Sequence, residues 1–252
     1  PSDVAGLILA WAALAAGQLR PDDRHTYGWQ RSSILAGFAN AIILLVAMGS
    51  LGWEAIERLR TPTIIDARTV MVVAGIGAVI NSLTALLFMS GSKHDLNLRG
   101  AFLHMAADAL VSVGVVLAGA FYLWQGWSWI DPAVSLVITV LIVFGTWSLL
   151  RETLHLLFDG VPSAITLTEV RQALRTLPGV IDLHDLHVWA LGTAENALTA
   201  HLVVVSEHAF DHSRLLVAAE KLLHDRFEIT HVTLQIETEA HARVCASDVC
   251  SA

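Results

Sequence analysis

Charged residues are scarce in this chain. Only 15% of its 252 residues are charged, whereas a soluble domain carries about 25%, and 55% of the residues are hydrophobic, with a mean hydropathy of +0.61. The charges that exist are sparse between residues 32 and 150 and dense after Arg151. This segregation argues against a single soluble domain. It predicts a membrane domain over residues 1–158, a soluble domain over 159–240 and a tail over 241–252.

Other absences narrow the function further. The net charge of −8, with no basic stripe, excludes nucleic acid as a partner. Cysteine is almost missing: Cys245 and Cys250 alone make no disulfide framework, so they are a candidate metal site or two free thiols in the tail. The sequence contains neither a His-Glu-x-x-His motif nor a Gly-x-x-x-x-Gly-Lys nucleotide loop. We therefore expect neither a metalloenzyme nor a pump driven by ATP.

What the sequence has is long hydrophobic runs. Four runs, at about residues 34–55, 69–90, 97–124 and 129–152, each approach or exceed the ~20 residues that cross a bilayer as a helix. A fifth run, over residues 3–16, is too short to cross and starts at the beginning of the sequence. We expect the sequence to begin inside a helix, with part of a span missing before it. The fold class is thus an α-helical membrane bundle followed by a soluble domain.

Basic residues in the loops predict the orientation. Because successive spans alternate in direction, six basic residues share one side with the soluble domain: Arg20, Arg24, Arg31, Lys93, Arg99 and Arg151. Arg58, Arg60 and Arg68 lie on the other side. Since basic residues accumulate on the cytoplasmic side, the soluble domain is expected in the cytoplasm.

One hydrophobic run contains an ionisable pair, His104 and Asp108. Residues four apart share one face of a helix, and ionisable groups within a bilayer usually mark a path for ions or protons. Alternatively, the two side chains only form a hydrogen bond within the helix or to a neighbour. We favour the functional reading.

The depth of these groups in the bilayer matches that of Asp3. Asp3 precedes Gly17 by 14 residues, or about 21 Å of helix. Asp108 follows Leu96 by 12 residues, or about 18 Å. Two carboxylates and an imidazole at one level supply three of the four ligands of a zinc-type site. The remaining ligand would lie four residues before Asp3, outside this sequence.

The soluble part shows alternating helix and strand signals. Thr166 and Glu169 fit a capping box at the start of a helix, and Pro178-Gly179 ends that helix. Residues 180–191 and 197–205 are β-rich runs around a turn, a helical run covers 212–227, and a strand covers 231–237. The predicted order is α-β-β-α-β, an α+β open-faced sandwich.

Four motifs together resemble the cation diffusion facilitator family, in particular its bacterial zinc exporters of the cobalt–zinc–cadmium resistance type. They are Ser-Asp-Val-Ala-Gly-Leu at residues 2–7, His-Thr-Tyr-Gly at 25–28, Asn-Leu-Arg-Gly-Ala leading into His-Met-Ala-Ala-Asp over 97–108, and His-Asp-Leu-His-Val-Trp at 184–189. The motifs run through almost the whole chain in the family's order.

This resemblance implies a fold, a partner and a mechanism. Family members have six transmembrane helices and a cytosolic metallochaperone-like domain, and they work as homodimers in the bacterial inner membrane that exchange Zn²⁺ for protons. The chain would then start in the second transmembrane helix. Asp3, His104 and Asp108 match three of the four transport ligands, and Cd²⁺ or Co²⁺ are further candidate substrates. A non-transporting, membrane-anchored zinc sensor or scaffold is the alternative function.

The resemblance also implies a metal site in the soluble domain. Residues three apart on a regular strand face opposite sides, so only one of His184 and His187 is expected to share a site with His201. A symmetric hairpin favours His187, whereas the family favours His184, which we adopt. His231 and Glu237 match a histidine and an acidic ligand of related domains. Each histidine alone is more often structural, but four such groups in one small domain favour metal binding.

Two weaker sites and one ion pair complete the predictions. In the first loop, Asp22 and His25 match part of a family metal site, although Trp29 replaces its last histidine; a solvated loop with an Asx turn is the alternative that we favour. Cys245 and Cys250 resemble a metal clip in the tails of relatives, with a longer gap.

In relatives, a basic and an acidic residue join the membrane helices near the soluble domain. Arg31 and Asp159 occupy the matching positions. The alternative is two independent charges at the membrane interface.

Overall fold

The structure is a computed structural model that describes residues 11–12, 15–17, 19–61, 67–93, 95–126, 129–205 and 211–242. The chain divides into two compact units, Pro1–Leu154 and His155–Ala252. Of the predicted partial span over residues 3–16, only residues 11–12 and 15–16 lie within the described part, and they are helical.

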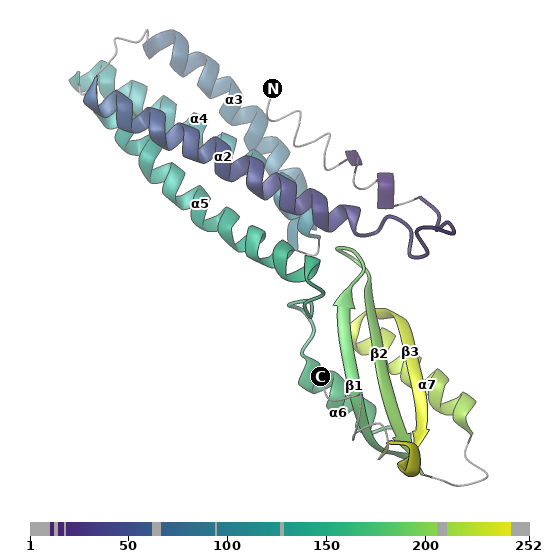
Figure 1. Ribbon diagram of the computed structural model, residues 1–252. Coiled ribbons are helices and arrows are strands. Elements are labelled where there is room, and N and C mark those ends of the chain that lie inside the picture. Colours follow the sequence, from purple (N-terminus) through teal and green to yellow (C-terminus); the bar gives the residue numbers. More distant parts are fainter. Residues whose placement is uncertain are drawn as a thin grey trace. The chain divides into compact units, whose positions relative to one another are not determined.

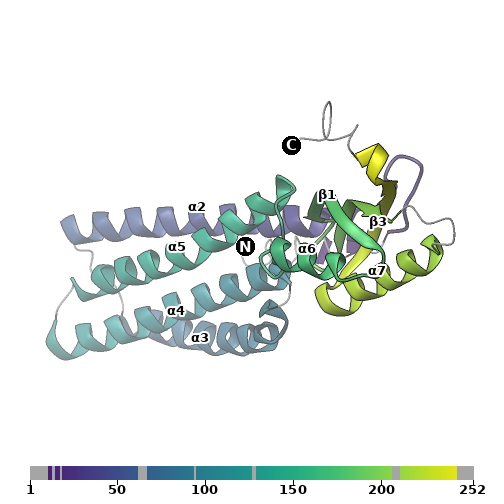
Figure 2. The same ribbon diagram turned by 90° about the horizontal axis from the view of Figure 1, so that it is seen from below.

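The first unit contains four long helices that lie side by side (Figures 1 and 2). They are α2 (Ser32–Arg60), α3 (Ala67–Met89), α4 (Leu96–Gln125) and α5 (Ile130–Leu157), with a short 3-10 turn η1 (Gly91–Lys93) before α4. All four are long and apolar enough to cross a membrane, which agrees with the four predicted full spans. The large apolar side chains of α3, such as Val72, Val73 and Leu87, are mostly exposed, as expected of a surface that faces lipid.

Small residues allow these helices to approach one another. A Cβ atom on Gly37 of α2 would lie 3.2 Å from Thr153 Cγ2 on α5, and one on Gly52 would lie 3.3 Å from Thr139 Cγ2. Between these two crossings, α2, α4 and α5 meet in an apolar layer of Leu44, Met48, Ala107 and Ile142. Close approach through small residues is the usual packing mode of helices in membranes, where burial of apolar surface supplies little driving force.

The second unit is an α-β-β-α-β domain, as predicted. Its elements are α6 (Leu167–Arg175), β1 (Val180–Ala190), β2 (Asn196–Val204), α7 (His212–Phe227) and β3 (Ile229–Thr238). The sheet order is β1-β2-β3; β1 and β2 pair antiparallel, whereas β2 and β3 pair parallel.

The ends of the helices follow from local chemistry, with one correction. Asp211 caps α7 by accepting a hydrogen bond from the backbone N–H of Arg214. Helix α6 begins after Thr166 as predicted, but the Thr166 side chain makes no capping hydrogen bond. Instead, its carbonyl oxygen accepts from the N–H groups of Glu169 and Val170. The predicted capping box is therefore absent.

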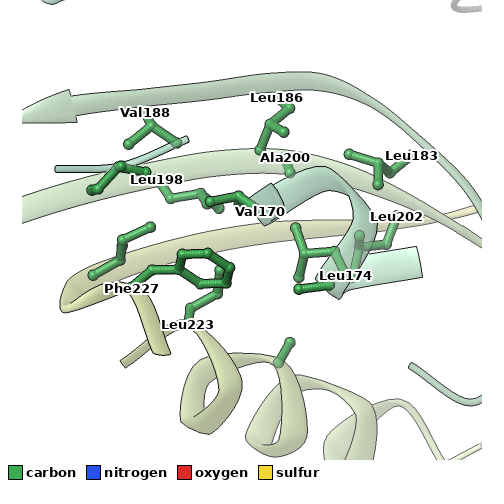
Figure 3. Close-up of a cluster of buried hydrophobic side chains, with 14 of the residues drawn as sticks. Val170, Leu174, Leu183, Leu186, Val188, Leu198, Ala200, Leu202, Leu223 and Phe227 are labelled. Atoms are coloured by element: carbon green, nitrogen blue, oxygen red, sulfur yellow. The ribbon is translucent and has the colours of Figure 1, made fainter. Parts of the chain in front are cut away.

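The core of this domain lies between the sheet and its two helices (Figure 3). Val170 and Leu174 of α6 and Leu223 and Phe227 of α7 pack against strand residues on one face of the sheet, which include Leu183, Leu186, Val188, Leu198, Ala200 and Leu202. The core therefore occupies one face of the sheet. Residues of the opposite phase, the histidines among them, are left on the other face.

Candidate metal centres

The membrane bundle holds a His–Asp pair on α4, in which the histidine is buried and the aspartate is half-buried. His104 Nε2 lies 3.5 Å from Asp108 Oδ2, and the side chains are 4% and 24% exposed. The four-residue spacing on a regular helix brings the two groups together, as predicted. Asp3 lies outside the described residues, so its place relative to this pair stays a prediction.

Two polar residues that the sequence analysis overlooked lie at the level of His104. Asn40 precedes Leu44 by four residues on α2, Thr146 follows Ile142 by four on α5, and His104 precedes Ala107 by three on α4. Each therefore lies about one turn from the apolar layer, on its side nearer Gly100. A Cβ atom on Gly100 would lie 2.8 Å from Asn40 Nδ2, which places the Asn40 amide against α4.

Both overlooked side chains are buried. Asn40 is 5% and Thr146 0% exposed, and within the described part of the chain Asn40 Oδ1 and Thr146 Oγ1 make no hydrogen bond. The sequence carried a signal for them: an asparagine within a hydrophobic run, and threonines seven residues apart at 139, 146 and 153.

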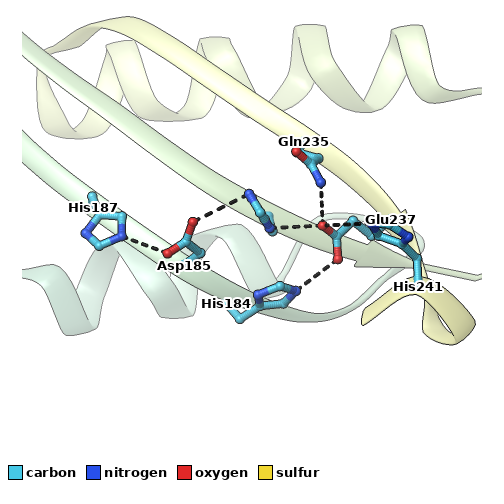
Figure 4. Close-up of polar contacts among 7 residues, drawn as sticks. His184, Asp185, His187, Gln235, Glu237 and His241 are labelled. Atoms are coloured by element: carbon cyan, nitrogen blue, oxygen red, sulfur yellow. Dashed lines mark hydrogen bonds and ion pairs between the residues drawn. The ribbon is translucent and has the colours of Figure 1, made fainter. Parts of the chain in front are cut away.

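In the soluble domain, His184, His201 and Glu237 come together (Figure 4). One ligand atom from each lies within 4.8 Å of the others. Glu237 Oε2 is 3.0 Å from His184 Nε2, and Oε1 is 2.9 Å from His201 Nδ1. The strands place them there, since His184 pairs with His201 in the β1–β2 register and His201 pairs with Gln235, two residues before Glu237 on the same face.

The donor set fits a divalent metal ion such as Zn²⁺. Two imidazoles and a carboxylate are typical zinc ligands, and Glu237 is only 3% exposed, so its charge needs a cationic or donating partner. Gln235 Nε2 donates one hydrogen bond to Oε1 at 2.6 Å. His201 Nδ1 is buried and makes no hydrogen bond within the described residues, although Glu237 Oε1 is close. The two atoms are near each other without hydrogen-bond geometry, as expected of two ligands that share an ion.

A β-bulge corrects the expected geometry of His184 and His187. The register shifts between His184 and His187, and Asp185 has a positive φ of 51°. Because the bulge adds one residue to β1, both histidines face the same side as His201, not opposite sides. His187 nevertheless pairs with Thr199, not with His201, so the symmetric hairpin is wrong and His184 is the residue opposite His201.

The bulge also exposes the Asp185 carboxylate on the histidine face (Figure 4). Its Oδ1 accepts a hydrogen bond from His187 Nε2 at 2.8 Å, and its Oδ2 lies 3.5 Å from His201 Nε2. The hydrogen bond from His187 lowers the pKa of Asp185 below its usual value. Asp185 could not be singled out from the sequence, because a regular strand would have turned it toward the core.

His231 does not join this cluster. In the parallel register it pairs with Ala197, four residues from His201, or roughly 13 Å along the strand, and its Nε2 lies 3.4 Å from Glu195 Oε2. The expectation that His231 shares the site was wrong for this reason. His241 approaches instead, with Nε2 3.9 Å from Glu237 Oε1; it lies on a short helical segment just after β3.

Backbone hydrogen bonds explain why Asp22 and His25 of the first loop lie close together. Asp22 Oδ1 accepts hydrogen bonds from the N–H groups of Arg24 and His25, which is an Asx-type turn, and it lies 3.2 Å from His25 Nδ1. The backbone hydrogen bond from His25 is the main cause that lowers the pKa of Asp22. The His25 ring also packs on Trp29, with centroids 4.1 Å apart. Turn geometry thus accounts for the pair, and its metal binding stays a prediction.

Four further predicted residues are not tested by these contacts. Cys245 and Cys250 lie outside the described residues. Arg31 belongs to the first compact unit and Asp159 to the second. The tail metal site and the ion pair therefore stay predictions.

Comparison with known proteins assigns both parts of the chain to one family. Residues 2–158 match the cation efflux transmembrane domain, and residues 162–239 match the cytoplasmic domain of cation efflux proteins.

Characterised relatives are similar along most of the chain. The zinc transporter ZitB of Escherichia coli K12 is 36% identical over 238 residues, 94% of this chain and 75% of the relative. The metal cation efflux protein CzcD of Cupriavidus metallidurans is 36% identical over 237 residues, 94% of this chain and 74% of the relative. A cadmium, cobalt and zinc/H⁺–K⁺ antiporter of Bacillus subtilis is 33% identical over 242 residues, 95% of this chain and 78% of the relative. A solved structure of the metal-bound C-terminal domain of CzcD is 38% identical, covers 29% of this chain and 99% of that domain, and has a TM-score of 0.26.

Proposed function

Because the chain belongs to the cation efflux family, we propose that it exports Zn²⁺ across the bacterial inner membrane in exchange for protons. Membership makes it a membrane-embedded efflux transporter of divalent metal cations and not an enzyme. Zinc is the metal in the name of the ZitB relative, and cadmium and cobalt join it in the name of the Bacillus antiporter; these two are the alternative substrates.

The observation that carries this proposal is the His104–Asp108 pair within the family's transmembrane domain, with His104 buried. Their nitrogen and oxygen atoms, 3.5 Å apart, are ligands that Zn²⁺ accepts, and Asp3 would add a second carboxylate. An ionisable pair in lipid is costly, and such pairs usually mark a path for ions. The site would therefore take up zinc near the middle of the bilayer.

Ligand chemistry couples zinc to protons. Zinc requires a neutral imidazole and ionised carboxylates, so binding expels the protons that these groups hold. Protonation from the outer side then weakens the site and releases zinc there. An inward proton gradient thereby drives zinc outward.

In this proposal the second unit faces the cytoplasm and joins two chains into a homodimer. The excess of basic residues on its side of the bundle supports the orientation, and the match to the family's cytoplasmic domain agrees with it. Its cluster of His184, His201 and Glu237 would bind zinc as a regulatory site. The alternative, a sensor or scaffold without transport, rests on the same cluster.

Zinc flux in proteoliposomes of the full-length protein separates the two functions. We expect Asp108→Asn to abolish zinc flux and zinc-induced proton release together, because the amide keeps the shape but neither binds zinc well nor titrates. His104→Ala and Asp3→Asn should do the same. Asp131→Asn is a matched control, since its side chain is also 24% exposed but pairs with Arg58 at the other end of the bundle.

Two outcomes would contradict the transport site. Substantial proton-coupled flux in the Asp108→Asn protein would exclude Asp108 from it. Absence of flux in the unchanged protein, with zinc bound to the soluble domain, would favour the sensor.

The tail cysteines are not part of the proposed transport site. Cys245→Ser should therefore leave zinc flux largely intact.

A further inference from the structure

His201 has a carboxylate at each of its two ring nitrogens. On one side, Nδ1 lies 2.9 Å from Glu237 Oε1; on the other, Nε2 lies 3.5 Å from Asp185 Oδ2. A neutral imidazole carries one N–H hydrogen. It can therefore donate to only one of these carboxylates, and the other nitrogen presents a lone pair.

The structure indicates which nitrogen presents the lone pair. Nδ1 makes no hydrogen bond within the described residues and lies 2.9 Å from Glu237 Oε1, on the side of the group of His184, His201 and Glu237. Nε2 points the other way, toward Asp185. When a metal ion occupies Nδ1, the hydrogen belongs on Nε2, where Asp185 can accept it.

The backbone holds Asp185 in this place. Its φ of 51° lies in the left-handed region, which L-residues other than asparagine and aspartate rarely adopt. The bulge that this conformation creates directs the carboxylate between His187 and His201. His187 donates to Oδ1 at 2.8 Å, which leaves Oδ2 free to turn toward His201.

We propose that Asp185 is a positioning residue of the soluble metal site: it accepts the Nε2–H of His201 and thereby presents Nδ1 to a zinc ion shared with His184 and Glu237. Metal-bound histidines generally donate their second N–H to such a carboxylate, which fixes the tautomer and strengthens the ligand. The inference rests on the proposed metal site. In this proposal Asp185 does not contact the metal. The hydrogen bond from His187 holds the Asp185 carboxylate in its orientation.

Zinc affinity tests this role in full-length protein in detergent, with Asp108→Asn as a background that removes the transport site. Asp185→Gly tolerates the positive φ but has no carboxylate, so we expect zinc to bind about 10–100-fold more weakly. Asp185→Asn retains an acceptor oxygen and should lose less. Asp182→Asn is the matched control, because it removes a carboxylate from the same strand that bonds Arg175 and not His201.

The tautomer of His201 in the zinc-loaded protein supplies a second readout. ¹⁵N NMR of histidine-labelled protein, assigned by comparison with His201→Gln, should show the Nε2–H form in the unchanged protein. In Asp185→Gly the spectrum should shift toward a mixture of tautomers. A purely structural role of Asp185 in the bulge would not move this signal when glycine preserves the backbone.

The outcomes distinguish this inference from the site on which it rests. If Glu237→Gln leaves the zinc affinity unchanged, the metal site itself is wrong, and the role of Asp185 in it is overturned too. If Glu237→Gln abolishes binding but Asp185→Gly has the affinity and tautomer of the unchanged protein, only the role of Asp185 is overturned.

Discussion

Thr146 and Thr153 lie two turns apart on α5, and both are fully buried at 0% exposure. Their hydroxyl groups differ in one respect. Thr153 Oγ1 donates to the carbonyl oxygen of Leu149 at 2.8 Å, whereas Thr146 Oγ1 makes no hydrogen bond within the described residues. An unsatisfied buried hydroxyl costs free energy, whereas a satisfied one contributes to stability.

This difference predicts opposite effects of one substitution. Valine has the shape of threonine without the hydroxyl, so Thr146→Val should raise the free energy of unfolding by about 1 kcal/mol, and Thr153→Val should lower it by about 1 kcal/mol. Thermal unfolding of the purified protein in detergent measures both. A loss of stability in Thr146→Val equal to that in Thr153→Val would show that the Thr146 hydroxyl has a partner in the folded protein.

At the scale of elements, the packing of α2 depends on where its glycines lie. A Cβ atom on Gly37 would lie 3.2 Å from Thr153 Cγ2 and 3.7 Å from the Leu96 carbonyl oxygen, whereas nothing described lies within 4 Å of a Cβ on Gly49. Gly37 therefore allows three helices to approach, and Gly49 does not contribute to this contact.

The two glycines form a matched pair for a test of helix packing. Gly37→Leu forces α4 and α5 away from α2, so we expect it to destabilise the bundle by about 1–3 kcal/mol. Gly49→Leu should be neutral or stabilising, because leucine in a helix is more favourable than glycine by ~1 kcal/mol. Melting temperatures in detergent provide the comparison. Equal losses at the two positions would contradict the packing of α2 against α4 and α5.

Strand β1 shows how one element decides a site. With a regular strand, His184 and His187 would face opposite sides and Asp185 would point toward the core. The bulge between them places all three on the histidine face instead. The core residues of β1 show the same register shift. Leu183 and Leu186 both face the helices although they are three residues apart.

At the scale of the whole molecule, charge bears on assembly. Residues 160–252 carry 12 acidic residues against 6 basic ones, a net charge of −6 with neutral histidines. Two such domains repel unless something neutralises them. The core of α6, α7 and the sheet belongs to this domain alone, so we expect the 160–252 fragment to fold by itself.

We predict that Zn²⁺ strengthens the dimer of this fragment, because an ion that binds the folded and associated form shifts both equilibria toward it. Analytical ultracentrifugation with zinc and with a chelator should show a lower dissociation constant with zinc, and the melting temperature should rise. Glu237→Gln is the control and should remove both effects. Identical profiles in zinc and in chelator would contradict a regulatory metal site.

The four spans, the α-β-β-α-β order and the His104–Asp108 pair could be predicted from the amino-acid sequence. Each of these depends on composition or on spacing within one element: about 20 apolar residues cross a bilayer, and residues four apart meet on a helix. The motifs at residues 97–108 and 184–189 added the family, which the comparisons confirmed along 94% of the chain.

Which groups from different elements meet became clear only from the folded chain. The spacing of residues along the strands could not reveal the bulge in β1, after which His184 lies opposite His201. It also could not reveal the parallel register in which His231 lies opposite Ala197, far from these two histidines. Asn40, Thr146 and Asp185 could not be identified as site residues from the sequence for the same reason, because their significance depends on neighbours from other segments. Sequence periodicity fixes what one element presents on each face, whereas register, bulges and helix crossings fix which faces come together, and these depend on packing across the whole domain.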